Sequence, residues 1–266
     1  MQSRTDLAFH AMHEEGILML ANCWDGGSAR IADAAGSRAL ATSSGAVAWA
    51  HGYSDGYQLP TELLLATVRD ITRASKLPLT VDIEDGYSDD PAQVVKFVEE
   101  LMATGVVGIN IEDGSKAPEL LVSKISAIRA AADKAGVKLY INARCDIFLR
   151  GLAPPLERAA EMLRRAALYK QAGASGLFAA GAAEHADIAA IVEGAGMPVN
   201  LLALTTLPPP ERLAAMGVRR LSAGSAPAEA MFGRAAFYMK RFLQTGEIDD
   251  EQSLTYGALN QLMKSE

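Results

Sequence analysis

The chain has 266 residues, and because 50% of them are hydrophobic and 21% are charged, it can bury one large core. The net charge of −7 and the pI near 5.2 argue against a nucleic-acid partner, which would need a basic face. The sequence contains no uncharged apolar run of about eighteen residues, the length that predicts a membrane-spanning helix. Its two cysteines cannot form a disulfide framework. We therefore expect a soluble protein of the reducing cytoplasm.

Strand and helix patterns alternate along the chain after a short leading helix, which we expect over residues 5–15. Eight apolar segments predict strands, each followed by a helical stretch. The predicted strands are 17–22, 39–42, 79–83, 107–111, 138–142, 176–179, 198–200 and 219–222. The predicted helices that follow them are 26–36, 61–75, 91–104, 118–135, 156–172, 183–194, 210–216 and 226–245.

This alternation favours parallel β–α units. Several helical stretches end at a glycine just before the next strand, as at Gly105, Gly136 and Gly173, which suits the residue that closes a helix. Eight such units predict an α/β fold, with a (β/α)8 TIM barrel preferred over an open doubly wound sheet, although periodicity alone leaves both open. We expect residues 1–245 to form the barrel and residues 246–266, with a helix over 251–262, to form a C-terminal helical extension.

Three acids stand together where the strand over 79–83 ends. Apolar residues alternate along the segment LTVDIEDGY, and Asp82, Glu84 and Asp85 follow at its turn. Because Asp82 and Glu84 are two residues apart, we expect both to leave the strand on the same side. Carboxylates so close repel one another unless a cation or water compensates them. The pattern predicts a two-carboxylate platform, and acids drawn to the start of the next helix are the alternative.

Other strand ends carry complementary polar residues. Ser43, Ser44 and Gly45 form a turn after the second strand, where N–H groups and hydroxyls could bind a carboxylate or phosphate, although an ordinary Ser/Gly turn is as good an interpretation. The other polar residues at strand ends or in the loops beyond them are Asp55, Glu112, Asp113, Arg144 and Asn200. Since the carboxyl ends of barrel strands meet at one rim, the sequence predicts that these side chains share a site.

A family resemblance rests on several motifs in their order and spacing: ANCWDGGSARIADAAG, the Ser-Ser-Gly turn, VDIEDGY, GVVGINIED, INAR and AGASGLF. Between about Gly16 and Gly233 the chain resembles the isocitrate lyase and phosphoenolpyruvate mutase superfamily, which includes methylisocitrate lyase and phosphonopyruvate hydrolase. The resemblance implies a (β/α)8 barrel whose last helix is swapped between subunits. It also implies a homo-oligomer, a dimer or a homotetramer.

The resemblance also implies roles for individual residues. Asp82 matches the acid that binds Mg²⁺ directly, with Mn²⁺ as the alternative ion. Glu84, Asp55 and Glu112 match acids that hold the ion mostly through water. The residues matched to substrate binding are Ser43, Ser44, Gly45, Arg144 and Asn200, and those expected to act in catalysis are Arg144 and Glu112. A metal-bound 2-oxo acid can form an enolate as a bond to C3 breaks, which agrees with this set of residues.

Departures from the family pattern leave the substrate open. The loop over 114–118 lacks the cysteine that protonates the enolate in family lyases, and Lys116 is either a residual lid lysine or a solvated one. Glu84 stands where the family usually has Asp, and the strand end at 178–180 lacks a polar residue. Cys145 we expect to pack in the core, and His10 and His13 to lie at the surface or in caps.

Three hypotheses follow. The first is a Mg²⁺-dependent lyase that cleaves or forms a C–C bond at C3 of a small 2-oxo or 2-hydroxy carboxylic acid. The second is an enzyme acting on a carbon–phosphorus bond, as in phosphonopyruvate hydrolysis or phosphoenolpyruvate mutation. The third is a barrel that binds a dicarboxylate without turning it over, because the proton donor of the lid is missing. The expected partner is therefore a small carboxylate or phosphonate.

Overall fold

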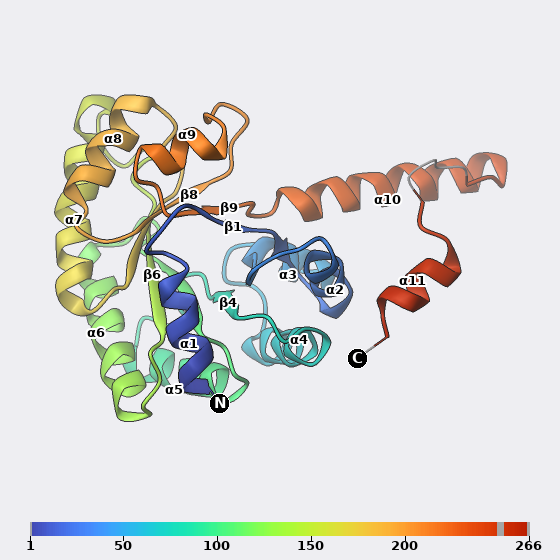
Figure 1. Cartoon of the computed structure of the whole chain (residues 1–266), viewed down its shortest axis with the longest axis horizontal. Helices are drawn as coiled ribbons and strands as arrows, with labels where there is room; N and C mark the ends of the chain where they lie inside the picture. The colour runs from blue at the N-terminus through green and yellow to red at the C-terminus, as the bar shows by residue number, and fades with distance from the viewer. Residues whose placement is uncertain (1, 249–252, 265–266) are drawn as a thin grey trace.

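The computed structural model describes residues 2–248 and 253–264, and within these ranges nine strands form one fully parallel sheet. The strands are β1 (Leu18–Leu20), β2 (Asn22–Cys23), β3 (Leu40–Thr42), β4 (Leu79–Asp82), β5 (Gly108–Glu112), β6 (Tyr140–Cys145), β7 (Gly176–Ala179), β8 (Val199–Leu202) and β9 (Arg220–Ser222). Helices surround the sheet (Figure 1). The predicted α/β barrel class is confirmed, and no helix of the described part of the chain is both long and apolar enough to cross a bilayer.

The first predicted strand, 17–22, is two short strands separated by Ala21. β1 pairs with β9, while β2 pairs with β3, so both edges of the nine-stranded sheet belong to one stretch of chain. The prediction of a single strand was wrong, since the chain changes its hydrogen-bonding neighbour at Ala21. This change closes the sheet into a barrel of eight positions.

The helices follow the predicted order, with two additions. They are α1 (Gln2–Ala11), α2 (Gly26–Ala34), α3 (Ser44–Ala50), α4 (Thr61–Ala74), α5 (Pro91–Ala103), α6 (Pro118–Lys134), η1 (Pro155–Glu157), α7 (Arg158–Ala172), α8 (His185–Gly194), α9 (Pro210–Ala215), α10 (Ala226–Thr245) and α11 (Tyr256–Leu262). The sequence missed α3, where the Ser43 hydroxyl accepts a hydrogen bond from the Ala46 N–H at 3.4 Å and caps the helix. The predicted helix over 156–172 begins with the separate 3₁₀ turn η1. Residues 251 and 252 of the predicted tail helix lie outside the described residues.

The strands bury side chains on both faces. Outward-facing residues such as Val81, Ile109 and Leu177 pack against the helices in one large core. A smaller cluster inside the barrel contains Phe9 from α1 and Tyr140 from β6. This inner cluster fills the lower barrel and leaves the upper part of the interior to polar side chains.

His13, which we expected at the surface or in a cap, is buried beneath the barrel. Its ring stacks on Tyr140 with centroids 4.1 Å apart, and its Nδ1 lies 2.8 Å from the Phe9 carbonyl oxygen. The surface alternative was wrong because the ring fills the space that α1 leaves at the barrel's lower end, whereas the contact with the Phe9 carbonyl caps the last turn of α1. Burial lowers the pKa of His13 to about 3.

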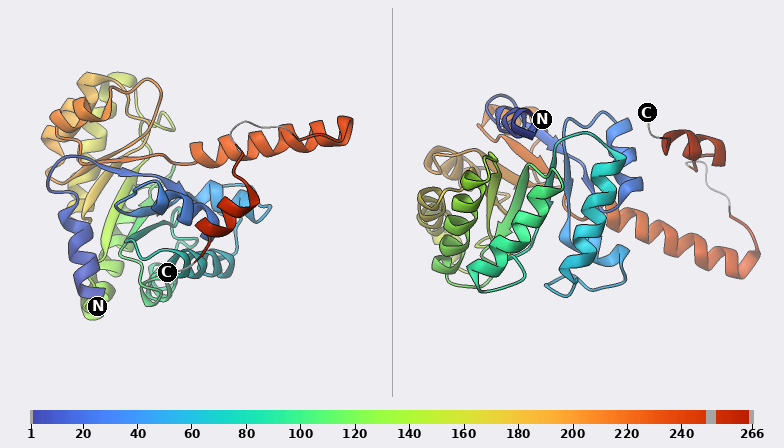
Figure 2. Two further views of the ribbon diagram at one scale, coloured as in Figure 1. Left: turned by 45° about the vertical axis from the view of Figure 1, so that its right-hand side comes forward. Right: turned by 90° about the horizontal axis from the view of Figure 1, so that it is seen from below.

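The C-terminal helices leave the barrel. α10 projects from the end of β9 into solvent, and α11 turns back towards α2 (Figures 1 and 2). Large apolar side chains along α10 are exposed, among them Phe237 (59%), Met239 (67%) and Leu243 (84%), and only Ala228 of this helix is buried. The first part of α10 contacts β2 and packs Phe232 against Trp49, whereas the apolar side chains further along the helix stay exposed within the described part of the subunit.

Candidate active site

A cavity of about 240 Å³ opens at the carboxyl ends of the strands. Every barrel position contributes to its wall directly or through the loop that follows, as expected for a barrel site. The lining residues are Asn22, Ser43, Ser44, Gly45, Trp49, Asp55, Asp82, Asn110, Arg144, Leu149, Phe178, Ala180, Leu202, Ser222, Gly224 and Ser225.

Two acids line the cavity, Asp82 at the end of β4 and Asp55 in the loop after α3. Asp82 is 8% exposed, and its backbone N–H donates to the Thr42 hydroxyl at 2.9 Å, which fixes the strand end against β3. Asp55 packs against Gly45, where a Cβ atom would lie 3.2 Å from the Asp55 carboxyl carbon. Glycine at position 45 therefore allows the Asp55 carboxylate to approach the start of α3.

Glu84 reaches the acid cluster by a different route from the predicted one. β4 ends at Asp82, and Glu84 lies in the turn beyond it with φ of 52°, so strand alternation does not set its direction. Its backbone N–H donates to Asp82 Oδ1 at 3.1 Å, and its Oε2 accepts from the Tyr57 backbone N–H. Left-handed backbone is strained for a residue with a Cβ, and its occurrence here, and at Tyr57 and Tyr87, is typical of functional loops.

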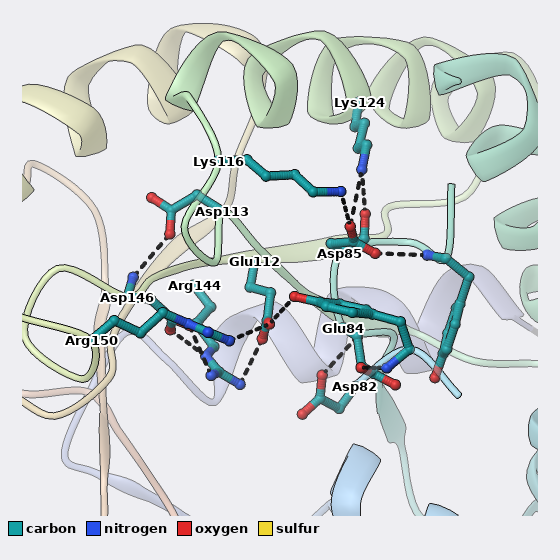
Figure 3. Close-up of polar contacts among 12 residues, drawn as sticks. Asp82, Glu84, Asp85, Glu112, Asp113, Lys116, Lys124, Arg144, Asp146 and Arg150 are labelled. Carbon is teal, nitrogen blue, oxygen red and sulfur yellow. Dashed lines mark hydrogen bonds and ion pairs between the residues drawn. The ribbon is translucent and has the colours of Figure 1, made fainter. Parts of the chain in front are cut away.

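Arg144 lies between two buried carboxylates (Figure 3). Its Nη1 is 2.7 Å from Glu112 Oε2, and its Nε is 2.6 Å from Asp146 Oδ1. Glu112 also accepts from the Tyr57 hydroxyl at 3.1 Å. Arg144 thus lines the cavity with its charge already balanced, and Glu112 orients it from outside the lining set.

Two further acids at the strand ends, Asp85 and Asp113, lie outside the cavity lining. Asp85 accepts from Lys116 Nζ at 2.7 Å, so Lys116 is neither a free loop lysine nor part of the cavity wall. Asp113 is 2% exposed and accepts from Arg165 Nη1 at 2.8 Å and from the Tyr169 hydroxyl at 2.6 Å. Asp113 thus joins the end of β5 to α7. Asp85 is linked to Lys124 of α6 as well as to Lys116 (Figure 3).

Burial disfavours the charged form of the inner acids, including Glu112, which is paired with Arg144. Burial raises the pKa of Asp82, Arg144 lowers it, and the neighbouring Asp55 raises it again. Burial likewise raises the pKa of Glu84 to about 7, against a lowering hydrogen bond from the Tyr57 backbone. Burial also raises the pKa of Glu112, to about 8, although Arg144 lowers it. Buried acids with raised pKa values are typical of a site that receives a cation.

The donor set fits a hard divalent ion. All the acids around Asp82 offer oxygen, which suits Mg²⁺ or Mn²⁺. No group of three or more His, Cys, Asp or Glu side chains in the described residues converges closely enough to hold an ion directly. One direct ligand with further acids acting through water is compatible with both observations, since Mg²⁺ retains part of its water shell.

The remaining predicted residues fall at different depths. Ser43, Ser44 and Gly45 line the cavity at the start of α3. Asn200 is 1% exposed and lies inside the barrel, where its Oδ1 accepts from the Ser222 hydroxyl at 3.2 Å, and it does not line the cavity. Cys145 packs in the outer core, as predicted.

Sequence reasoning missed several lining residues. Asn22, Asn110 and Ser222 lie within strands, and Trp49 and Phe178 are large side chains that supply apolar wall. A usable signal existed for Asn110, because it is the polar residue at an inward position of the otherwise apolar segment GINI.

A closed parallel barrel with a polar cavity at the carboxyl ends of its strands is the architecture of barrel enzymes. A family model described as phosphoenolpyruvate phosphomutase matches residues 9–243. The chain belongs to this family, and so to the isocitrate lyase and phosphoenolpyruvate mutase superfamily of lyases and mutases. The resemblance stated from the motifs is therefore confirmed.

Three similar proteins illustrate the family. The uncharacterised protein Rv1998c of Mycobacterium tuberculosis H37Rv is 34% identical over 251 residues, 91% of this chain and 90% of that protein. The 2-methylisocitrate lyase of Escherichia coli K12 is 29% identical over 202 residues, 71% of this chain and 66% of the lyase. A solved structure from Burkholderia cenocepacia J2315, provisionally assigned as a phosphonomutase, is 37% identical with a TM-score of 0.84 and covers 89% of this chain and 99% of its own.

Proposed function

We propose that the chain is a Mg²⁺-dependent lyase that cleaves or forms a C–C bond at C3 of a small 2-oxo or 2-hydroxy carboxylic acid. The observation that carries this proposal is the meeting of Asp82, Asp55 and Arg144 on the wall of one cavity. The acids suit a small divalent cation, and the guanidinium suits a carboxylate. The similarity to a 2-methylisocitrate lyase supports the same class of reaction.

In this proposal Asp82 holds the cation directly, while Asp55, Glu84 and Glu112 hold it through water. A divalent cation bound there supplies charge stabilisation for the enolate of the substrate. Mn²⁺ is the alternative ion.

Residues of the cavity wall orient the substrate and stabilise its charge. The backbone N–H groups of Ser44 and Gly45 and the hydroxyl of Ser43 orient the substrate carboxylate at the start of α3. Arg144 donates its remaining guanidinium N–H groups to the substrate oxygen on which negative charge develops, and the buried carboxylates of Glu112 and Asp146 hold its guanidinium in place. We assign Asn200 to support of the cavity floor, because it contacts Ser222, which lines the cavity.

A second candidate is cleavage or rearrangement of a C–P bond. The observation that favours it is the similarity, at 37% identity, to a protein provisionally assigned as a phosphonomutase.

A third candidate function is a barrel that binds a dicarboxylate without turnover. The loop after β5 contains no cysteine that could protonate an enolate. Lys116 of this loop donates to Asp85 and Asp89 instead of facing the cavity, so it does not offer a proton either.

Product analysis separates these functions. The purified protein is incubated with Mg²⁺ and a panel of 2-hydroxy and 2-oxo dicarboxylates and phosphonopyruvate. Release of pyruvate or glyoxylate is expected for the lyase, whereas release of phosphate or formation of phosphoenolpyruvate would establish the C–P reaction instead. Saturable binding of a dicarboxylate without any product would support the binding-only function and overturn the proposed lyase activity.

We also propose that the exposed apolar face of α10, with residues 246–266 as the extension beyond it, is an assembly surface in a cytoplasmic dimer or tetramer. Phe237, Met239 and Leu243 would be costly to leave in water. Both cysteines are buried and free, which suits a reducing compartment. Light scattering that gave a 28.1 kDa monomer at micromolar concentration would contradict the assembly.

A further inference from the structure

Arg220 is a charged side chain inside the barrel. It lies on β9, is 1% exposed, and is the largest fully buried side chain of the described chain. Its neighbours in register are Leu18 on β1 and Asn200 on β8. Burial lowers the pKa of Arg220 to about 10, so the guanidinium keeps its charge at neutral pH.

No acid of the described residues forms an ion pair with Arg220, although the negative charge of Asp82 acts on its pKa at longer range. Its Nη2 donates to Asn110 Oδ1 at 3.1 Å, and its Nε donates to the Ser222 hydroxyl at 3.2 Å. Among the residues that the structure describes, Nη1 has no hydrogen-bond partner, and no carboxylate forms an ion pair with the guanidinium. Arg144 differs sharply, since two buried carboxylates already neutralise it.

The surrounding polar layer is also incomplete. Asn110 Oδ1 accepts a second hydrogen bond from Asn142 Nδ2 at 2.9 Å, and the Ser222 hydroxyl donates to Asn200 Oδ1 at 3.2 Å. Asn142 Oδ1 and Asn200 Nδ2 have no partner within the described residues. A layer built only for stability would be expected to satisfy such groups, because each unpaired buried polar atom is destabilising.

This layer is the floor of the cavity. Both hydrogen-bond partners of Arg220, Asn110 and Ser222, line the cavity wall. The guanidinium therefore lies one side chain below the space where a substrate would bind. A buried cation without a counterion is unfavourable, and an anion placed above it relieves that cost.

We propose that Arg220 is a positioning residue that makes the site select dianions, small dicarboxylates or phosphonocarboxylates, over monoanions of the same size. It acts through Asn110, whose Nδ2 amide group it polarises as a donor towards the cavity. The Ser222 hydroxyl, which donates to Asn200, holds the Arg220 Nε in place. The inference rests on the proposed function, in which an anionic substrate occupies this cavity. It assigns the selectivity for charge to Arg220 and not to Arg144, whose charge is already used.

The test measures binding without turnover. Dissociation constants of oxalate, a dianion, and pyruvate, a monoanion, are determined by calorimetry with saturating Mg²⁺ for the wild type, Arg220→Met and Arg220→Lys. Arg220→Met should reduce the preference for oxalate over pyruvate by about tenfold or more, and Arg220→Lys should keep most of it, because the charge remains. The melting temperature of Arg220→Met should not fall, since an unbalanced buried charge has been removed.

Outcomes separate this inference from the proposed function. If Arg220→Met keeps the wild-type preference, or weakens both ligands equally, the inference is wrong while the function stands. If the wild type binds neither oxalate nor pyruvate, both are wrong. If Arg220→Met does not fold, Ser222→Ala and Asn110→Ala replace it. Each should reduce the oxalate preference by about threefold, and an unchanged preference in both would overturn the inference.

Discussion

Two acids at the ends of the neighbouring strands β4 and β5 have opposite surroundings. Asp82 faces the barrel mouth, beside Asp55, with its pKa raised by burial. Asp113, only one residue beyond β5, faces the helices and receives hydrogen bonds from Arg165, Tyr169 and the backbone of Asp146. Both acids are buried, but only the outer one is fully supplied with donors.

The comparison shows that compensation, and not burial or residue type, separates a structural acid from one available to a ligand. An acid whose donors all come from the protein has no capacity left for an ion and stabilises the fold. An acid left next to another acid gains from an added cation. Opposite outcomes are therefore expected from mutating the inner and the outer acid.

The largest effect is expected at the inner acid. Asp82→Ala should lower Mg²⁺-dependent kcat by about 10⁴-fold, on the order of 5.5 kcal/mol, because the direct ligand is lost. The free energy of unfolding without metal should not fall, since removing one charge relieves repulsion with Asp55. Calorimetric titration with Mg²⁺ checks the cause, and an unchanged Mg²⁺ affinity would show that Asp82 is not the ligand.

The outer acid should behave in the opposite way. Asp113→Ala should lower the free energy of unfolding by about 3–4 kcal/mol, because Arg165 and Tyr169 lose a buried partner. Mg²⁺ affinity of the folded variant should stay within about twofold of the wild type, since Asp113 lies outside the cavity lining. Urea unfolding measures the first quantity and calorimetry the second.

Asp70→Ala is the matched control for the outer acid. Asp70 pairs with Arg73 on an exposed face of α4, so its loss should cost only about 0–1 kcal/mol. Equal destabilisation by Asp70→Ala and Asp113→Ala would mean that burial of the Asp113 network contributes nothing.

The sequence was sufficient for the fold and for part of the site. Strand and helix periods, with glycines at helix ends, predicted the β–α units, and an acid or arginine directly after an apolar run located Asp82 and Arg144. Glu84 was located for the wrong reason, because the strand ends before it and a left-handed turn sets its direction. A turn of that kind at a non-glycine residue has no clear sequence signal.

Depth within the barrel could not be predicted from strand ends alone. Asn200 lies below the cavity, whereas Ser222 on the neighbouring strand lines it. β8 continues to Leu202, beyond the predicted strand end at Asn200, so Leu202 and not Asn200 pairs with Ser222 and reaches the cavity wall. Arg220 was missed because a charged residue within a strand gives no indication of whether it faces the lumen.

Arg144 combines features of the structural residues and of the residues available to a ligand, because it lines the cavity and is also paired with protein carboxylates. Arg144→Lys should lower kcat/KM by about a hundredfold, on the order of 2.7 kcal/mol, since lysine cannot replace a planar guanidinium held by Glu112 and Asp146. Stability should also fall, by about 1–3 kcal/mol, because both partners are buried. Near-normal turnover with lowered stability would make Arg144 purely structural.

The smallest effect concerns His13, a buried group at the opposite end of the barrel from the site. Burial lowers its pKa to about 3, and Arg220 and His10 contribute in the same direction, whereas the unfolded chain titrates near 6.5. Above pH 6.5 both states are neutral and the stability is complete. As pH falls from 6.5 towards 3, the unfolded state binds a proton that the folded state does not, so stability decreases.

At pH 5 this loss should reach about 2 kcal/mol relative to pH 7.5, measured as the difference in urea unfolding between wild type and His13→Gln. Subtracting the variant removes the contribution of other groups, including His10, whose pKa is also lowered by burial. The variant itself should be less stable at pH 7.5, since it loses the stacking on Tyr140. Parallel stability curves for the two proteins between pH 7.5 and 5 would mean that His13 accepts a proton in the folded barrel, and that the lower end of the barrel admits water.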